Sequence, residues 1–185
     1  MKSTALVTLL IMVTIIFASQ VSLGDMDDDD DYKFWQKKPG VNPVSNALYQ
    51  DECGSCHFAY QPGLLPSRSW QKLMGGLEDH FGDNAELDPA DQQAISSFLD
   101  NNGADKSSFR RSTKIMRSLG NSQTPFRITE VPYIVHKHDE IPSRLVNNNP
   151  KVGSLSHCDK CHQTVSKGSF SERDISIPGF GKWDD

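Results

Sequence analysis

The chain has 185 residues with 24 acidic and 19 basic side chains, which gives a formal charge of −5, and 36% of its residues are hydrophobic. A chain of this length suits one compact domain or two small ones. The low hydrophobic content argues against a large conventional core. The acidic balance, without a recognised nucleic-acid motif, argues against a nucleic-acid-binding protein.

Residues 1–24 have the pattern of a secretory signal peptide. Lys2 supplies a minimal positive region, an apolar run extends from Ala5 to Ala18, and small residues precede a plausible cleavage site. An uncleaved membrane anchor is the alternative, but the run is shorter than the roughly 20 residues that a spanning helix needs. We therefore expect an exported protein whose body has no membrane span.

Residues 25–44 are predicted to form an irregular leader. Six aspartates lie among the seven residues from Asp25 to Asp31, whereas acidic and basic side chains balance in the rest of the mature chain. Pro39, Gly40 and Pro43 interrupt any regular element. We expect the acidic run to be solvated, and an electrostatic contact with a basic partner is the alternative.

Two copies of the motif Cys-x-x-Cys-His, at residues 53–57 and 158–162, use all four cysteines of the chain. In this motif each thiol adds to one vinyl group of a haem, and the adjacent His binds the iron. We therefore predict two covalently attached haem c groups. The attachment residues are Cys53, Cys56, Cys158 and Cys161, and the proximal iron ligands are His57 and His162.

Three other uses of paired cysteines fit less well. A zinc site would bring the two pairs together, but they lie far apart in the chain and each carries its own His. A thioredoxin-like dithiol would follow a strand, and no strand pattern precedes either pair. Two structural disulfides suit an exported protein but leave both histidines without a role. Haem attachment accounts for the cysteines and the histidines together.

Residues 45–103 form the first predicted haem lobe. Ser69 is predicted to cap a helix with an apolar stripe over Trp70–Leu77. His80 extends this stripe, and a buried imidazole is costly unless it binds something, so His80 is predicted as the distal ligand of the first iron. Met74 shares the stripe and is the alternative ligand, although core packing suits it better.

The best-marked helix is predicted to begin after Asp88, with Pro89 in its first turn, and to end at Asn102 before Gly103. Residues 104–123 then bridge the two lobes with one apolar and one basic face. The basic residues are Lys106, Arg110, Arg111, Lys114 and Arg117. We expect a solvated helix surface there; compensation of haem propionates and docking of an acidic redox partner are the alternatives.

Residues 124–185 form the second predicted haem lobe, where frequent prolines favour short helices joined by loops. Two histidines compete for the distal position of the second iron. His138 continues an apolar helical stripe through Ile134, whereas acidic residues follow His136. His138 is therefore predicted as the ligand, and His136 remains the alternative. His157 adjoins the second motif and is expected to be a surface residue.

Both irons would then be six-coordinate, with His57 and His80 on the first and His162 and His138 on the second. Histidine in place of methionine favours the ferric state, so both reduction potentials are predicted to be low. A filled coordination shell favours electron transfer over oxygen or peroxide chemistry. The alternatives to an electron carrier are a haem peroxidase or reductase, and a redox sensor or subunit of a membrane complex.

Longer stretches resemble the dihaem cytochromes c of the bacterial periplasm. The similarity includes residues 52–60 around the first motif, segments within 62–85, and segments within 127–142 before the second motif, and it covers about residues 46–183. The resemblance implies a small, mainly α-helical electron-transfer protein of two lobes, with one covalently bound bis-histidine haem per lobe and little or no β-sheet. His80 and His138 match the distal ligands of that family.

The resemblance also implies the redox partners of the chain. A membrane-bound b-type cytochrome is the expected electron donor, and a small periplasmic haem protein is the expected acceptor. We therefore expect a periplasmic electron carrier, with no catalytic residues, rather than an enzyme.

Overall fold

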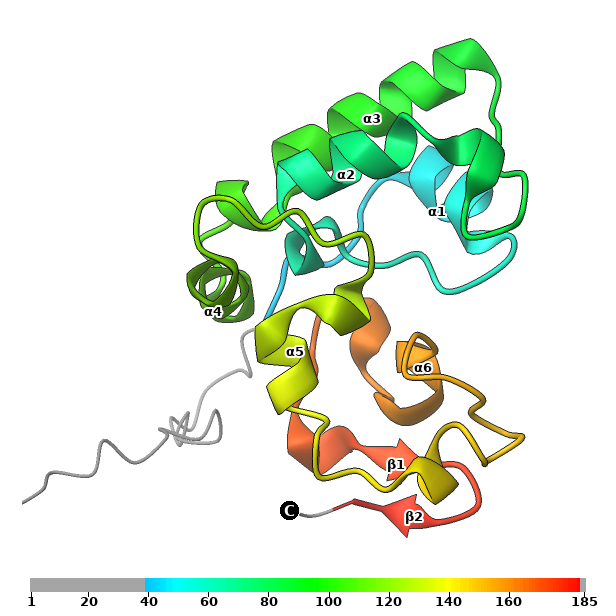
Figure 1. Cartoon of the computed structure of the whole chain (residues 1–185), viewed down its shortest axis with the longest axis vertical. Helices are drawn as coiled ribbons and strands as arrows, with labels where there is room; N and C mark the ends of the chain where they lie inside the picture. Colours follow the sequence, from blue (N-terminus) through cyan, green and yellow to red (C-terminus); the bar gives the residue numbers. More distant parts are fainter. Residues whose placement is uncertain (1–38, 184–185) are drawn as a thin grey trace, which may run out of the picture. The chain divides into compact units, whose positions relative to one another are not determined.

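The structure is a computed structural model and describes residues 39–183, which fall within one compact unit. These residues form six α-helices, seven short 3₁₀ turns and one two-stranded hairpin. The helices are α1 (Ala47–Gly54), α2 (Ser67–Met74), α3 (Pro89–Asn102), α4 (Arg110–Leu119), α5 (Pro132–His136) and α6 (Cys158–Cys161). The antiparallel strands are β1 (Ser176–Ile177) and β2 (Gly181–Lys182). The prediction of a mainly α-helical fold with little β-sheet is confirmed (Figure 1).

Several predictions concern residues outside this range. The predicted signal peptide and the acidic run of the leader lie outside the described residues, and the proposed lobe boundaries stay predictions. Within residues 39–183, no helix combines the length and apolar character needed to cross a membrane.

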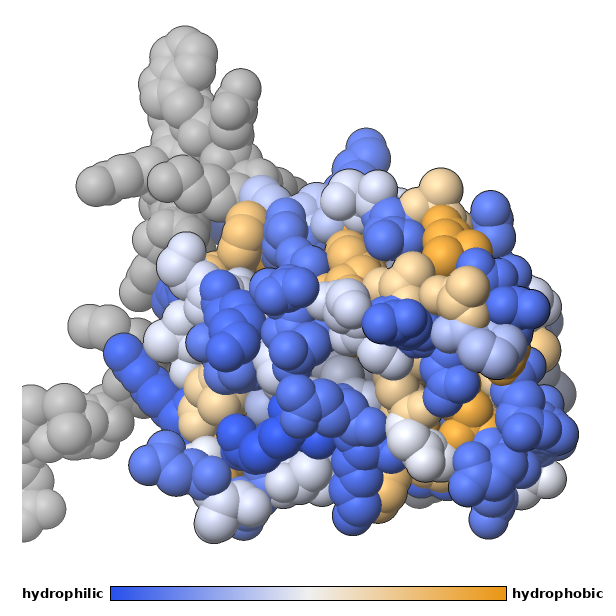
Figure 2. Space-filling view, turned by 90° about the horizontal axis from the view of Figure 1, so that it is seen from above, coloured by the Kyte–Doolittle hydropathy of each residue, from blue (hydrophilic) through white to orange (hydrophobic). Residues whose placement is uncertain are grey.

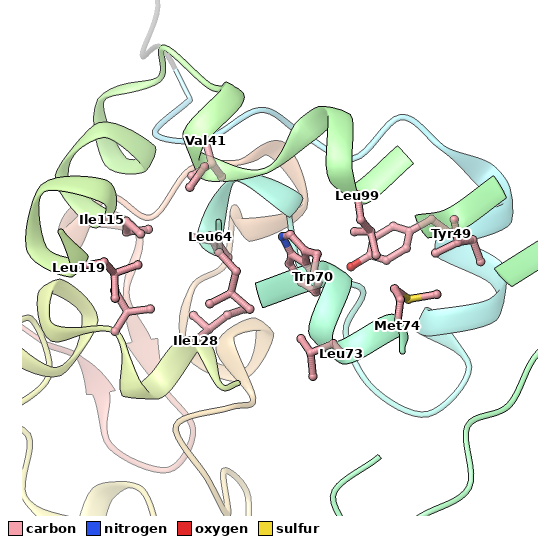
Figure 3. Packing of buried hydrophobic residues seen from close by; sticks show 14 of the residues in the cluster. Val41, Tyr49, Leu64, Trp70, Leu73, Met74, Leu99, Ile115, Leu119 and Ile128 are labelled. Carbon is pink, nitrogen blue, oxygen red and sulfur yellow. The ribbon is translucent and has the colours of Figure 1, made fainter. Parts of the chain in front are cut away.

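Helices α2 and α3 pack against each other and build much of the larger hydrophobic cluster (Figures 1 and 3). The strongly amphipathic α2 buries Trp70, Leu73 and Met74, while α3 buries Ile95 and Leu99. Burial of each such side chain stabilises the fold by about 1.5–3 kcal/mol. This pair therefore forms a packed base against which neighbouring segments lie.

The ends of α3 are as predicted. Asp88 accepts a hydrogen bond from the Ala90 amide at 3.0 Å, Pro89 occupies the first turn, and the helix ends at Asn102 before Gly103. Since both end signals lie next to the helix in the sequence, they can be recognised without the tertiary structure.

The predicted start of α2 at Ser69 is wrong. The helix begins at Ser67, and Ser69 is fully buried within its first turn. The preceding residue, Pro66, offers no side-chain cap, so the Ser67 amide instead donates to Oδ1 of Asp105 at 2.6 Å. A carboxylate from a segment 38 positions away thus caps this helix.

The predicted extension of α2 to His80 is also wrong. The helix ends at Met74, because Gly75 and Gly76 follow and glycine is a poor helix former. A 3₁₀ turn (Leu77–Asp79) then buries Leu77 and leads to His80. His80 therefore leaves the helical stripe and lies in a separate turn.

Helix α4 joins the N-terminal and C-terminal parts of the described chain. Its Ile115 and Leu119 side chains are buried in the larger cluster, and the fully buried Ser112 hydroxyl donates to the carbonyl of Gly63 at 2.9 Å. Close by, the Gly40 amide donates to the carbonyl of Gly168 at 2.9 Å. Helix α4 thus contacts α5 as well as segments that precede it in the chain.

Gly168 occupies a position that requires glycine. Its φ is +72°, in the left-handed region, and a Cβ there would collide with the carbonyl oxygen of Val41. The residue therefore allows the start of the described chain to lie directly against the segment that follows the second motif.

The C-terminal part has a much smaller hydrophobic cluster. Four buried residues, Leu145, Val146, Val152 and Ile177, form it, compared with fifteen in the larger cluster. So few buried side chains give little stability by themselves.

The outer surface is mostly hydrophilic on the face in Figure 2, with small apolar patches between charged residues. Two exposed aromatic side chains of the described chain, Phe81 and Phe126, each have a cation over the ring. The Arg127 guanidinium is 3.8 Å from the ring centre of Phe81, and the Lys72 ammonium is 4.0 Å from that of Phe126. Such contacts shield part of the aromatic surface.

Candidate haem centres

The first motif begins near the end of α1 and continues into the turn that follows it. Cys53 is half-buried within the helix, Ser55 is its C-cap, and Cys56 is exposed. His57 follows with a half-buried ring whose Nδ1 donates to the carbonyl of Phe58 at 2.8 Å. Since Nδ1 carries the proton in this bond, Nε2 is left with the lone pair that a metal needs.

His80 lies opposite His57. The two ring centres are 6.2 Å apart, and the ring planes differ by 21°. A metal held at roughly 2 Å from each imidazole nitrogen, with about 1 Å from each nitrogen to its ring centre, separates two ring centres by about 6 Å. The spacing of this pair, the first site, therefore fits an iron between the two rings.

The turn around His80 is tight. The His80 amide donates to the carbonyl of Asp83 at 2.7 Å, and the intervening Phe81 and Gly82 have φ values of +61° and +101°. A positive φ is uncommon for a bulky residue and marks a constrained backbone. The chain thus reverses direction directly after His80, and this tight turn places the His80 ring opposite that of His57.

The second motif forms α6, a single helical turn. Cys158 and Cys161 are its first and last residues, and His162 is its C-cap. The ring of His162 lies 6.1 Å from that of His138, with an interplanar angle of 76°. This pair, the second site, has the same spacing as the first but nearly perpendicular rings.

The structure separates the two histidines that compete for the second site. Helix α5 ends at His136, and His138 follows beyond the C-cap, so the predicted helical stripe stops short of it. His138 nevertheless turns inward, and its Nδ1 donates to the carbonyl of Ile134 at 2.7 Å. The side chain of His136 is 62% exposed and pairs with Asp139 at 3.3 Å. The structure thus brings His138 to His162.

The remaining alternative ligands lie in other surroundings. Met74 is buried in the larger hydrophobic cluster, as expected for core packing. His157 is exposed, in agreement with the expected surface position, and its Nδ1 donates to the carbonyl of Val152 at 2.6 Å. Among residues 39–183, no three or more His, Cys, Asp or Glu side chains gather in the manner of a zinc site.

A cavity surrounds the second site. His138, His162, Cys158 and Cys161 line it together with mainly apolar side chains, which include Ile134, Val152, Ile175 and Trp183. A flat macrocycle with an apolar body suits such a lining, while two imidazoles offer iron ligands and two thiols offer attachment points. The residues of the second site thus fit a covalently attached haem.

Burial favours the uncharged form of His162. The pKa of His162 is lowered to about 3, chiefly because burial penalises the cation and also because His138 and Arg111 are nearby. A neutral imidazole is the form that binds iron. The Nδ1 atom of His162 is buried without a hydrogen-bond partner among the described residues. No hydrogen bond therefore fixes which ring nitrogen of His162 carries the proton. The fit of His162 as an iron ligand depends on its position opposite His138.

The thiols of Cys53 and Cys158 differ from those of redox-active dithiols. Burial, with a smaller effect from Glu52, raises the pKa of Cys53 to about 11, and burial, followed by Asp159, raises that of Cys158 to about 12. A thioredoxin-like cysteine instead has a lowered pKa. The cysteine environment therefore argues against the dithiol alternative.

Arg111 departs from the prediction of a solvated basic surface. It is half-buried, lines the cavity of the second site, and donates to the Tyr133 hydroxyl at 3.1 Å and to the Phe170 carbonyl at 3.3 Å. Helical periodicity alone placed it with the exposed basic residues. Its inward position depends on the packing of α4 against α5, which the sequence does not reveal.

Comparison with known proteins identifies the family. The profile of the dihaem cytochrome c family matches residues 49–170, well over half of the chain. The chain belongs to the dihaem cytochrome c family. No curated protein sequence matches it.

Solved structures of dihaem cytochromes c are similar to this chain. One from Shewanella baltica OS155 has 44% sequence identity and a TM-score of 0.63, and the match covers 75% of this chain and 98% of the other. One from Rhodobacter sphaeroides has 40% identity and a TM-score of 0.62, with 70% of this chain and 99% of the other covered.

Membership of the dihaem cytochromes c confirms the predicted cofactors. The protein is an electron-transfer haem protein with two covalently bound haem c groups and their irons. The bound haem supplies the redox-active iron. The chain would hold the first group through Cys53, Cys56 and His57 and the second through Cys158, Cys161 and His162, with the apolar surroundings excluding water.

Proposed function

We propose that this dihaem cytochrome c is a periplasmic electron carrier with two low-potential, bis-histidine haems. The observation that carries the proposal is the pair of opposed histidine rings at each site, 6.2 Å apart at the first and 6.1 Å apart at the second. His80 and His138 are the proposed distal ligands, opposite His57 and His162.

Two features of the site chemistry support a carrier rather than an enzyme. Occupied axial positions leave no site for peroxide or oxygen, and an iron that keeps both ligands needs little rearrangement when its charge changes. Two imidazole ligands also stabilise the ferric state more than His with Met does, which lowers the potential. Electron transfer at low potential is therefore the chemistry that this arrangement favours.

Location and partners belong to the same proposal. The signal-like residues 1–24 and the export that c-type haem attachment demands favour the periplasm. The resemblance noted in the sequence favours a membrane-bound b-type cytochrome as donor and a small soluble haem protein as acceptor. A carrier with two haems can accept from one partner while it donates to the other.

A redox titration with a carbon monoxide challenge tests the carrier function. We expect two reversible transitions at potentials well below those of His/Met cytochromes, no carbon monoxide binding by the reduced protein and no peroxidase turnover. A haem that binds carbon monoxide, or measurable peroxide reduction, would favour the enzyme alternative instead.

A further inference from the structure

One side chain touches both haem-binding segments. Tyr60 lies three residues after His57, and the two ring centres are 5.1 Å apart with planes inclined by 35°. Its hydroxyl donates to the carbonyl oxygen of Ser156 at 2.7 Å, across 96 positions of sequence. Ser156 is two residues before Cys158, the first attachment residue of the second haem. Tyr60 thus connects the proximal ligand of the first site to the attachment loop of the second.

The surrounding contacts hold Tyr60 in place. The Tyr49 hydroxyl donates to the carbonyl of Tyr60 at 2.6 Å. The next residue, Gln61, is fully buried and donates through Nε2 to the carbonyl of Val165, three residues beyond His162. The segment is therefore fastened to α1 on one side and to the second haem-binding segment on the other.

Electron tunnelling through a protein weakens steeply with distance, and it weakens less along covalent and hydrogen bonds than across gaps between atoms. The contacts described above form a short sequence from the His57 ring to the Tyr60 ring, through its hydroxyl to the Ser156 carbonyl, and along the backbone to Cys158. Only the step from ring to ring lacks a bond. This sequence of contacts is a favourable path between the two sites.

We propose that Tyr60 is the positioning residue that couples the two haem sites electronically. One electron leaves the iron of one site and arrives at the iron of the other, while Tyr60 keeps its proton and all of its own electrons. The proposal rests on the proposed role of His57 as an iron ligand. It adds a specific route for transfer within the molecule.

The test compares holoprotein variants. Tyr60→Phe keeps the ring on His57 and removes the hydroxyl, whereas Tyr60→Leu removes both. Tyr49→Phe is the matched control, because it removes a hydroxyl hydrogen bond to the same segment without interrupting the path. The rate of transfer between haems is measured after rapid photoreduction, and the melting temperature, spectra and potentials are measured alongside.

We expect a several-fold slower transfer in Tyr60→Phe and a further decrease in Tyr60→Leu. The melting temperature should fall by about 2–4 °C in both Phe variants, since each loses one hydrogen bond, but Tyr49→Phe should keep the wild-type transfer rate. Wild-type rates in both Tyr60 variants, with spectra and potentials unchanged, would make Tyr60 a structural tether only and overturn the proposal.

A second measurement, the NMR signals of the Tyr60 ring, does not depend on the rate of electron transfer between the haems. In protein labelled with ¹³C-tyrosine, the Tyr60 ring signals should shift when the first haem is oxidised and again when the second is oxidised. A response to one haem alone would contradict the proposed bridge. A wild-type protein with an open, high-spin haem would instead contradict the proposed function, so the two failures can be distinguished.

Discussion

Replacement of His138, the proposed distal ligand of the second site, should leave that iron five-coordinate and the iron of the first site six-coordinate. In His138→Ala the ring opposite His162 is lost, together with the bond from Nδ1 to the Ile134 carbonyl. The matched control is His136→Ala, whose side chain is 62% exposed and makes a surface pair with Asp139. The two variants remove the same chemical group two residues apart, in different surroundings.

The structure sets the size of each effect. The partly buried hydrogen bond of His138 contributes about 0.5–1.5 kcal/mol, and the loss of the proposed axial bond and the gap left by the ring add to that. We expect His138→Ala to lower the free energy of unfolding by about 2 kcal/mol or more. An exposed pair such as that of His136 contributes between about 0 and 1 kcal/mol, so the control should be nearly neutral.

Absorption spectra and carbon monoxide titration measure the outcome. In ferric His138→Ala, half of the haem should become high-spin, and the reduced variant should bind one carbon monoxide per protein. The control should keep the wild-type spectrum and bind none. If the control lost its low-spin spectrum while His138→Ala kept it, His136 would be the ligand and our reasoning from ring positions would be refuted.

Three further predictions concern other residues. Asp105→Ala should destabilise the protein by about 1 kcal/mol at neutral pH. Burial raises the pKa of Asp105, but the hydrogen bonds from Ser67 outweigh burial and lower it, so the stabilisation is present above about pH 4 and is lost as the pH falls through the lowered pKa. Urea titrations at several pH values can check this. Gly168→Ala should lower the free energy of unfolding by about 3 kcal/mol or more, because the new Cβ is both strained and in collision with Val41. Gly120 also has a positive φ but open space around it, so Gly120→Ala should lower it by about 1–2 kcal/mol. Equal losses in thermal unfolding would contradict the packing argument. His80→Met should raise the potential of the first haem in a redox titration, and an unchanged potential would mean that residue 80 is not an axial ligand.

Features with local signals could be predicted from the sequence. The two Cys-x-x-Cys-His motifs predicted both haems, and the Asp88 cap with Gly103 predicted both ends of α3. Each of these depends on residues that are close together in the chain. The mainly helical fold followed from the same kind of signal, together with the resemblance to the dihaem cytochromes c.

Features that depend on tertiary contacts could not be predicted in the same way. The cap of α2 comes from Asp105, which is remote in sequence, so the nearby Ser69 was a misleading signal. His80 was expected on a helix, but its position is set by a glycine pair and a tight reversal. Tyr60 carried no local signal at all, since its partner Ser156 is distant in sequence.

The central claim, that both irons are closed by two histidines, is tested most directly by low-temperature electron paramagnetic resonance of the ferric protein. The ring planes differ by 21° at the first site and by 76° at the second, and ligand-plane orientation shapes the low-spin signal. We predict two low-spin signals of equal weight, a rhombic one from the first site and a strongly anisotropic one from the second. A high-spin signal that accounts for either haem would contradict the account.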